Sequence, residues 1–204
     1  MTAAYRPLTP DADIAGVDEA GRGPLAGPLM VAAVVLDPAR PVAGIDDSKR
    51  LSEARREGLF DRIIESALGW HIERIEPVEI DRINILQATL NGMRHCLRQL
   101  SATPKLALID GNRLPVDLPC AARAIVRGDA LEPAIGAASI LAKVSRDRAM
   151  LVLHREFPAY GFDLHKGYPT ALHLQRLREF GPCPAHRFSY APVRQAASPG
   201  LLFS

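Results

Sequence analysis

The segment PLMVAAVVL at 28–36 constrains the fold most strongly, because it is apolar throughout and rich in valine. Such a run is typical of a strand that is covered on both faces. It is too short to cross a bilayer, which requires roughly 20 residues. Covering both faces of a strand needs a layer of structure on each side, so a layered fold around an internal sheet is expected.

Strand patterns and helix patterns alternate along most of the chain. Ser52 fits the N-cap of one helix, and Pro133 fits the first turn of another. The short, glycine-rich link between the first two strands favours an antiparallel start and a mixed sheet. The alternation predicts an α/β fold. Strands are predicted at 13–17, 28–36, 69–76, 105–110 and 122–126, and helices at 53–67, 85–100, 132–156 and 171–180.

Composition sets broad limits on the class of protein. A chain of 204 residues with 48% hydrophobic residues suits a single globular domain, 1–204. The opening MTAAYRPLTPDAD has no apolar core of a signal peptide, which favours a cytoplasmic location. The three cysteines form no Cys-x-x-Cys pair, so neither a disulfide framework nor a zinc site is indicated. The net charge of +2 does not by itself predict a nucleic-acid partner.

Acidic residues follow or end three of the predicted strands. Asp18 and Glu19 come after 13–17, Asp110 ends 105–110, and Asp129 comes shortly after 122–126. Each alone also fits a turn or a helix cap. If the strand ends meet at one edge of the sheet, the four carboxylates converge, and hard oxygen ligands of this kind suit Mg²⁺ or Mn²⁺. Two such ions would support phosphodiester hydrolysis.

Seven segments stand out along about residues 13–194. They are DEAGRGPLAGP (18–28), DDSKRLSE (46–53), EIDRINILQAT (79–89), IDG (109–111), GDA with AASILAKVSRDR (137–148), HKGYPT (165–170) and HRFSYAPV (186–193). In order and spacing these segments together resemble the ribonuclease HII family. DEAGRGPLAGP and AASILAKVSRDR are long enough to make this resemblance specific.

The resemblance implies a fold and an activity. The fold would be ribonuclease H-like, a mixed β-sheet flanked by helices, with a helical C-terminal extension and tail over about 158–204. The activity would be metal-dependent cleavage of the RNA strand of RNA/DNA hybrids, and cleavage 5′ of single ribonucleotides in duplex DNA, which leaves 3′-hydroxyl and 5′-phosphate ends. The role implied is ribonucleotide excision repair. A two-metal site for Mg²⁺ or Mn²⁺ would be held by Asp18, Glu19, Asp110 and Asp129.

Substrate recognition is carried over by position as well. Gly21, Arg22 and Gly23 match a GRG segment whose backbone would read the ribonucleotide 2′-hydroxyl, the group that separates RNA from DNA. Tyr168 matches a tyrosine that would pack on the next deoxyribose. The alternatives are a turn with a surface arginine and a rim aromatic residue. Pro169 departs from the small residue expected there, and restricts the backbone of Tyr168.

Other polar residues are weaker candidates. Lys49, Lys143 and Arg146 could bind phosphate, although solvated surface charge explains the last two equally well. Asp147 is interpreted as a structural partner of a basic residue. The histidines lack metal-ligand spacing and are interpreted as structural or surface residues, with His165 the most relevant because it adjoins Tyr168. This group comprises His154, His165, His173 and His186.

Three alternatives compete with this interpretation. Ribonuclease HIII usually has an N-terminal substrate-binding domain and lacks the GRG arginine, whereas here Arg22 is present and the first acid stands at position 18. A binding module without catalysis would lack a carboxylate. A transposase-like or Holliday-junction nuclease would not explain HKGY. We expect a monomer that binds hybrid or ribonucleotide-containing duplexes and no membrane; a sliding-clamp contact through the final LLFS is a further possibility.

Overall fold

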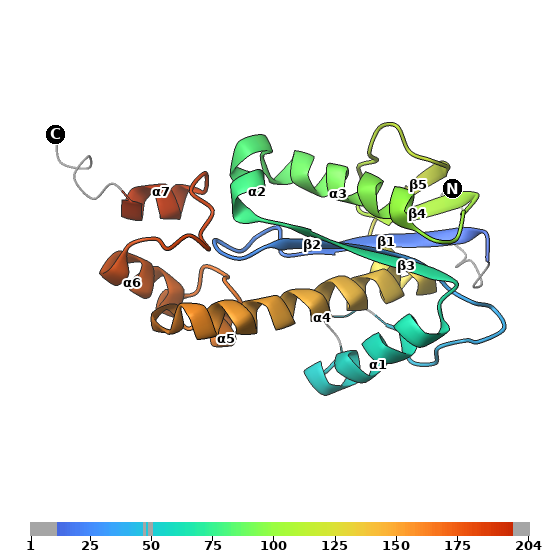
Figure 1. The fold of residues 1–204 in the computed structure, drawn as a ribbon, viewed down its shortest axis with the longest axis horizontal. Helices are drawn as coiled ribbons and strands as arrows, with labels where there is room; N and C mark the ends of the chain where they lie inside the picture. The colour runs from blue at the N-terminus through green and yellow to red at the C-terminus, as the bar shows by residue number, and fades with distance from the viewer. Residues whose placement is uncertain (1–11, 47, 49–50, 198–204) are drawn as a thin grey trace, which may run out of the picture. The chain divides into compact units, whose positions relative to one another are not determined.

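The computed structural model describes residues 12–46, 48 and 51–197 (Figure 1). The chain forms a mixed sheet with flanking helices, as the sequence predicts. The elements are β1 (Ile14–Ala20), β2 (Leu29–Val35), α1 (Glu53–Ser66), β3 (Gly69–Ile75), α2 (Pro77–Ile83), α3 (Ile85–Gln99), β4 (Leu106–Asp110), β5 (Ala121–Ile125), the 3₁₀ turn η1 (Gly128–Ala130), α4 (Pro133–Glu156), the 3₁₀ turn η2 (Pro158–Tyr160), α5 (Phe162–His165), α6 (Ala171–Phe180) and α7 (Ala191–Ala197).

The sheet has the strand order β3-β2-β1-β4-β5. Strands β1, β4 and β5 pair in parallel. Strands β1 and β2 are neighbours joined only by residues 21–28, which is too short for a parallel crossover. The antiparallel start expected from the sequence therefore accounts for the mixed character of the sheet.

The described residues form two compact units. Unit 1 comprises residues 12–20, 31–73 and 90–144, apart from the undescribed positions 47, 49 and 50. Unit 2 comprises residues 21–30, 74–89 and 145–197. This grouping does not test the prediction of a single domain over 1–204, which stays a prediction. None of the helices in the described part of the chain has the length and apolar character that a membrane span requires.

Unit 1 holds the centre of the sheet, with α1 and the first half of α4 on one side and the second half of α3 on the other (Figure 1). Ile135 of α4 packs with Leu108 of β4 and Ile125 of β5 in one buried cluster. Gly16 permits β1 to approach α4 closely, since a Cβ there would lie 2.0 Å from the backbone of Ala134. The sheet therefore packs closely against the start of α4.

Local sequence signals explain where several helices begin. The Ser52 side chain accepts a hydrogen bond from the Arg55 amide at 3.3 Å and so caps α1, as predicted. Pro133 begins α4, also as predicted. Unit 2 contains α7, which the sequence did not predict, because seven residues give no clear helical period. Val193 on α7 is fully buried against Leu25 and Leu177.

Candidate active site

Two of the predicted acids lie at the same level on adjacent parallel strands. Val17 of β1 is paired in register with Ile109 of β4, and each is followed directly by an acid, Asp18 or Asp110. Neighbouring residues at one level of a sheet point to the same face, so the two carboxylates meet near the carboxyl end of β4. Here β1 continues to Ala20, beyond the predicted end at residue 17, because backbone pairing extends past the apolar pattern.

The electrostatics of this pair are unfavourable in the absence of a cation. Asp18 is only 5% exposed. Burial, followed by repulsion from Glu19 and Asp110, raises the pKa of Asp18 well above its usual value. Hydrogen bonds oppose this shift, including the one donated by the Glu19 amide at 2.7 Å. The buried carboxyl group of Asp18 therefore interacts electrostatically with two partly buried carboxylates of unit 1, those of Glu19 and Asp110.

Asp129 lies in η1, which begins three residues after the last residue of β5. The amide of its neighbour Gly128 donates a 2.7 Å hydrogen bond to Oδ1 of Asp110. The Asp129 side chain is buried and accepts from the Ala130 amide at 3.1 Å. The turn that carries Asp129 is thus hydrogen-bonded directly to the Asp110 carboxylate. The four acids predicted from the sequence all belong to unit 1.

The residues present fit a divalent cation. The four side chains offer carboxylate oxygens alone, which are the ligands that Mg²⁺ and Mn²⁺ prefer. Buried carboxylates that repel one another are stabilised when positive charge enters between them. The pKa of Asp18 is raised mainly by burial and then by repulsion from Glu19 and Asp110. The chemistry of the donor set and the burial of Asp18 therefore agree on a hard metal ion.

The GRG segment belongs to unit 2, where buried arginines hold its backbone. Gly21 has a φ of 102°, and a Cβ there would lie 2.1 Å from Nε of Arg146. Arg187 donates to the carbonyl oxygens of Gly21 at 2.6 Å and Arg22 at 3.0 Å. It also donates to the Gly27 carbonyl at 2.9 Å. The Arg187 side chain therefore holds the loop in place through hydrogen bonds to the carbonyl groups of its backbone.

Tyr168 lies beside this loop in unit 2 and remains 45% exposed. Its Cε1 is 3.7 Å from the position of a Cβ on Gly23. The Tyr168 amide donates to the His165 carbonyl at 2.9 Å, and its own carbonyl accepts from Nδ1 of His173 at 2.9 Å. Unit 2 therefore brings together the two substrate-recognition elements predicted from the sequence, with the tyrosine ring accessible.

Arg146 is 1% exposed and supports both elements. Its Nη2 donates to the Lys166 carbonyl at 2.9 Å, and its guanidinium lies 5.7 Å from the centre of the Tyr168 ring. Burial, followed by repulsion from Arg187, lowers the pKa of Arg146 to about 10, and the nearby Asp147 carboxylate opposes this. Asp147 is buried, and its role as a structural partner of a basic residue stays a prediction. The expected phosphate contact of Arg146 stays a prediction, and its burial favours a supporting role.

Of the two lysine candidates, only Lys143 belongs to the described residues. Lys143 lies on α4 and is half-buried. Lys49 lies outside the described residues. Phosphate contacts by both lysines stay predictions.

Sequence analysis identified Arg187 only as part of the HRFSYAPV segment and gave it no role. The same holds for the hydrogen-bonded arrangement of three buried histidines, His165, His173 and His186. The rings of His165 and His173 are stacked with centroids 4.3 Å apart, and Nε2 of His173 lies 3.1 Å from Nε2 of His186. Only the sequence position of His165 beside Tyr168 signalled this group.

Each of the three histidines has a complete set of partners in its neutral form. His173 donates from Nδ1 to the Tyr168 carbonyl, which leaves its Nε2 to accept from Nε2 of His186. Nδ1 of His186 then accepts from the Cys183 amide at 3.0 Å. A second proton on His173 would place two N–H groups against each other. The chain of hydrogen bonds that ends at Tyr168 therefore requires neutral imidazoles.

Acidification is expected to destabilise the protein through these histidines. Burial is the main cause that lowers the pKa of both His173 and His186 from 6.5 to about 4. Between these values the unfolded chain binds protons that the folded protein does not, so the free energy of unfolding falls as pH drops from 6.5 to about 4 and is retained above 6.5. One such shift corresponds to about 3 kcal/mol. Urea unfolding across this range measures the loss.

The matched variants for this experiment are His173→Gln and His154→Gln. His154 is half-buried, pairs with Asp163 at 3.1 Å and has no hydrogen bond to His173 or His186 among the described contacts. His173→Gln should reduce the dependence of unfolding on pH, and His154→Gln should preserve it. Equal pH dependence in both variants would contradict the assignment.

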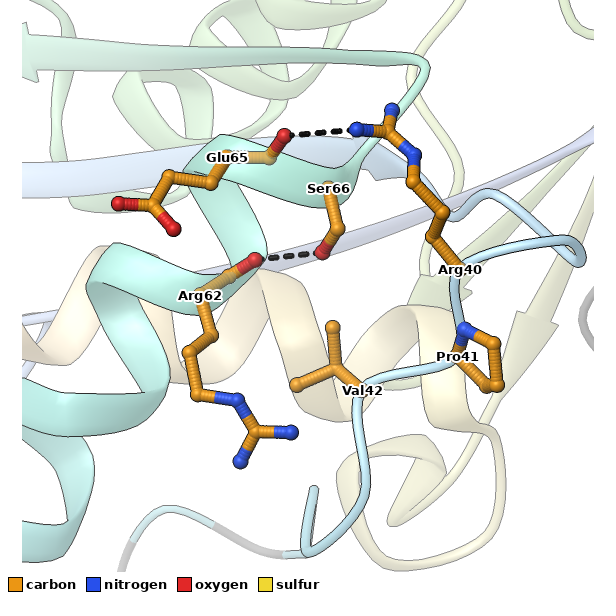
Figure 2. Close-up of a pocket in the computed structure, with 6 residues that line it drawn as sticks. All are labelled: Arg40, Pro41, Val42, Arg62, Glu65 and Ser66. Atoms are coloured by element: carbon orange, nitrogen blue, oxygen red, sulfur yellow. Dashed lines mark hydrogen bonds between the residues drawn. The ribbon is translucent and has the colours of Figure 1, made fainter.

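A separate hollow of about 320 Å³ lies on unit 1 (Figure 2). Arg40 donates across it to the carbonyl of Glu65 at 3.1 Å, as the figure shows. None of the predicted active-site residues lines it. The hollow therefore adds nothing to the candidate site.

Comparison with protein families gives one matching model, described as ribonuclease HII, over residues 15–193. The ribonuclease HII of Xanthomonas campestris pv. campestris (strain 8004) is 60% identical over 184 residues, which cover 90% of this chain and 77% of that protein. The ribonuclease HII of Burkholderia pseudomallei (strain 1710b) is 58% identical over 183 residues, which cover 90% and 85%. The similarity extends over both units.

Solved structures show the same fold. Ribonuclease H2 from Pyrococcus horikoshii OT3 aligns with a TM-score of 0.77 and 27% identity, over 91% of this chain and 97% of that one. The RNase HII of Archaeoglobus fulgidus, solved in a complex with PCNA, aligns with a TM-score of 0.72 and 26% identity, over 87% and 94%. The ribonuclease H-like architecture predicted from the sequence is confirmed.

Proposed function

Because the chain belongs to the ribonuclease HII family, a family of metal-dependent endoribonucleases, we propose that its four carboxylates in unit 1 hold the metal and that the GRG loop with Tyr168 selects the substrate. The enzyme cleaves the RNA strand of RNA/DNA hybrids and cleaves at ribonucleotides embedded in DNA. The observation that carries the proposal is the register of β1 and β4, which aligns Asp18 with Asp110.

Asp18, Glu19, Asp110 and Asp129 are proposed to bind two Mg²⁺ or Mn²⁺ ions together with the substrate. Bound divalent cations supply an activated water and neutralise charge on the phosphodiester. The protein residues supply the fixed positions: Gly128 holds the Asp110 carboxylate by its 2.7 Å hydrogen bond. The products proposed are a 3′-hydroxyl and a 5′-phosphate.

Recognition of the ribonucleotide is proposed to use backbone groups of Gly21, Arg22 and Gly23. The hydrogen bonds from Arg187 occupy carbonyl oxygens on one side of this loop. Only one residue, Ala20, separates Glu19 from Gly21 in the chain. The exposed ring of Tyr168 offers a flat surface for the following deoxyribose.

The proposal is tested with a labelled DNA duplex that contains one ribonucleotide. A nick on its 5′ side in the presence of Mg²⁺ or Mn²⁺, lost with a chelator and restored by added metal, is the expected result. Cleavage of a continuous hybrid without a nick at the lone ribonucleotide would retain the carboxylate site and contradict the recognition role of Tyr168. No cleavage of either substrate would contradict both parts.

Tyr168→Ala is expected to lower the cleavage rate at a lone ribonucleotide by about tenfold or more, the scale of losing one aromatic stacking contact. Binding of the duplex should weaken less, because phosphate contacts remain. Single-turnover rates and binding isotherms measure the two effects. Tyr168→Phe, which keeps the flat ring, is the control and should retain most of the rate. An equal loss of binding and cleavage in Tyr168→Ala would argue against a role in sensing the junction.

The cytoplasmic location and the monomeric state stay predictions. The complex with PCNA concerns the Archaeoglobus fulgidus protein. For this chain, a clamp contact through LLFS at 201–204 is a proposal on residues outside the described part.

A further inference from the structure

A group of three potential metal ligands lies in unit 1, apart in sequence from the four acids. His71 and Glu73 are two residues apart on β3, so their side chains share one face of the strand. His95 comes from α3 and faces the same carboxylate. Each residue offers one ligand atom, and the three atoms all lie within 4.8 Å of one another. No role in the family's reaction accounts for this arrangement.

Both imidazole rings face the same carboxylate oxygen atom, Oε2 of Glu73. Nε2 of His71 lies 3.4 Å from Oε2 of Glu73, and Nε2 of His95 lies 3.5 Å from the same Oε2. The two rings are inclined at 69° with centroids 5.7 Å apart, so their ligand atoms converge without stacking. Oε2 of Glu73 is therefore at nearly the same distance from both imidazole nitrogens, and all three ligand atoms lie within 4.8 Å of one another.

These separations are long for hydrogen bonds and match those between ligands of one metal ion. An N–H···O hydrogen bond normally has a donor–acceptor distance of about 2.7–3.2 Å. Ligands at about 2.0–2.1 Å from a tetrahedral zinc ion lie about 3.3 Å from one another. The observed 3.4 and 3.5 Å are closer to the second arrangement. The side chains already stand at ligand spacing.

We propose that His71, Glu73 and His95 bind a transition-metal ion, with Zn²⁺ as the committed occupant. Two imidazole nitrogens and one carboxylate oxygen form a donor set suited to zinc, whereas Mg²⁺ prefers oxygen ligands alone. Between 29% and 50% of each side chain is exposed, so water can reach the remaining coordination position. The site is therefore distinct in chemistry from the four-carboxylate site.

The neighbouring thiol does not complete the set. Cys96 follows His95, but it is fully buried and its Sγ donates to the Val31 carbonyl at 3.4 Å. Burial is the main cause that raises the pKa of this thiol to about 12. Zinc bound by the three ligands would connect β3 to α3. Its expected effect is to stabilise unit 1 against unfolding.

Zinc titration of the protein in excess Mg²⁺ tests the proposal. Asp110→Asn is used as the background, so that zinc binding at the acids does not mask the signal. Trp70, the single tryptophan of the chain, precedes His71 and is partly exposed, so its fluorescence reports occupancy. We expect saturable binding of zinc at one site and a melting temperature raised by about 5 °C in excess zinc. When Co²⁺ replaces Zn²⁺ in the titration, we expect the visible absorption band of a tetrahedral Co²⁺ ion.

The decisive comparison is His95→Gln against His154→Gln in that background. His95 is half exposed, so its replacement should leave the metal-free melting temperature nearly unchanged. Loss of this ligand should weaken zinc binding by about tenfold or more, since even outer-sphere changes have effects of this size. His154→Gln should bind as the background does. Absence of saturable zinc binding, or equal affinity in both variants, would overturn the proposal.

Discussion

Asp110→Asn is expected to reduce the cleavage rate by about 10²–10³-fold, the scale of losing one group that stabilises transition-state charge. Folding should be almost unaffected, because asparagine retains the Oδ1 atom that accepts from the Gly128 amide. The substitution also removes one of the charges that repel Asp18. The free energy of unfolding without metal should therefore be unchanged or slightly increased. Single-turnover cleavage and urea unfolding measure the two quantities.

A surface acid provides the matched control for this substitution. Asp117 has a side chain that is 76% exposed and a φ of 54°, a conformation that asparagine adopts readily. Asp117→Asn should change neither the rate nor the stability measurably. Full activity of Asp110→Asn at saturating metal would remove Asp110 from the metal site. A large loss of stability would show that its role is structural.

Arg187→Met is expected to destabilise the protein by about 3 kcal/mol, because the carbonyl oxygens of the buried Gly21 and Gly27 lose their guanidinium donor. The Arg22 carbonyl, in contrast, keeps the Tyr190 hydroxyl as a donor. The guanidinium is fully buried and donates to three carbonyls of the loop, those of Gly21, Arg22 and Gly27. Methionine retains the apolar stem and removes the donors. Cleavage at a lone ribonucleotide should fall as well, since the loop loses its fixed backbone position.

Two further variants distinguish donor geometry from charge. Arg187→Lys keeps the positive charge but not the planar fork, and should remain destabilised. Arg176→Met removes a surface arginine that pairs with Glu179 at 2.9 Å, and should change stability by less than about 1 kcal/mol. Thermal and urea unfolding measure all three. Recovery of stability in Arg187→Lys would refute the argument from the carbonyl contacts.

Local signals in the sequence were sufficient for much of the fold. The valine-rich run at 28–36 predicted β2, and Ser52 predicted the start of α1, because burial pattern and capping depend on residues close in sequence. The four acids were identified through their positions after strands together with the family resemblance. The boundary of β1 was placed too early, since the pattern loses its apolar character at Asp18 while the strand continues.

The sequence by itself, through the strand-end acids and the family resemblance, predicted which side chains carry the chemistry: the four acids, the GRG segment and Tyr168. Only the tertiary structure decided how they are held. The alignment of Asp18 with Asp110 follows from the register of β1 and β4, which joins segments about ninety residues apart. Arg187 reaches Gly21 across 166 positions. Such contacts leave no periodic signal along the chain, because their geometry arises from packing between distant segments.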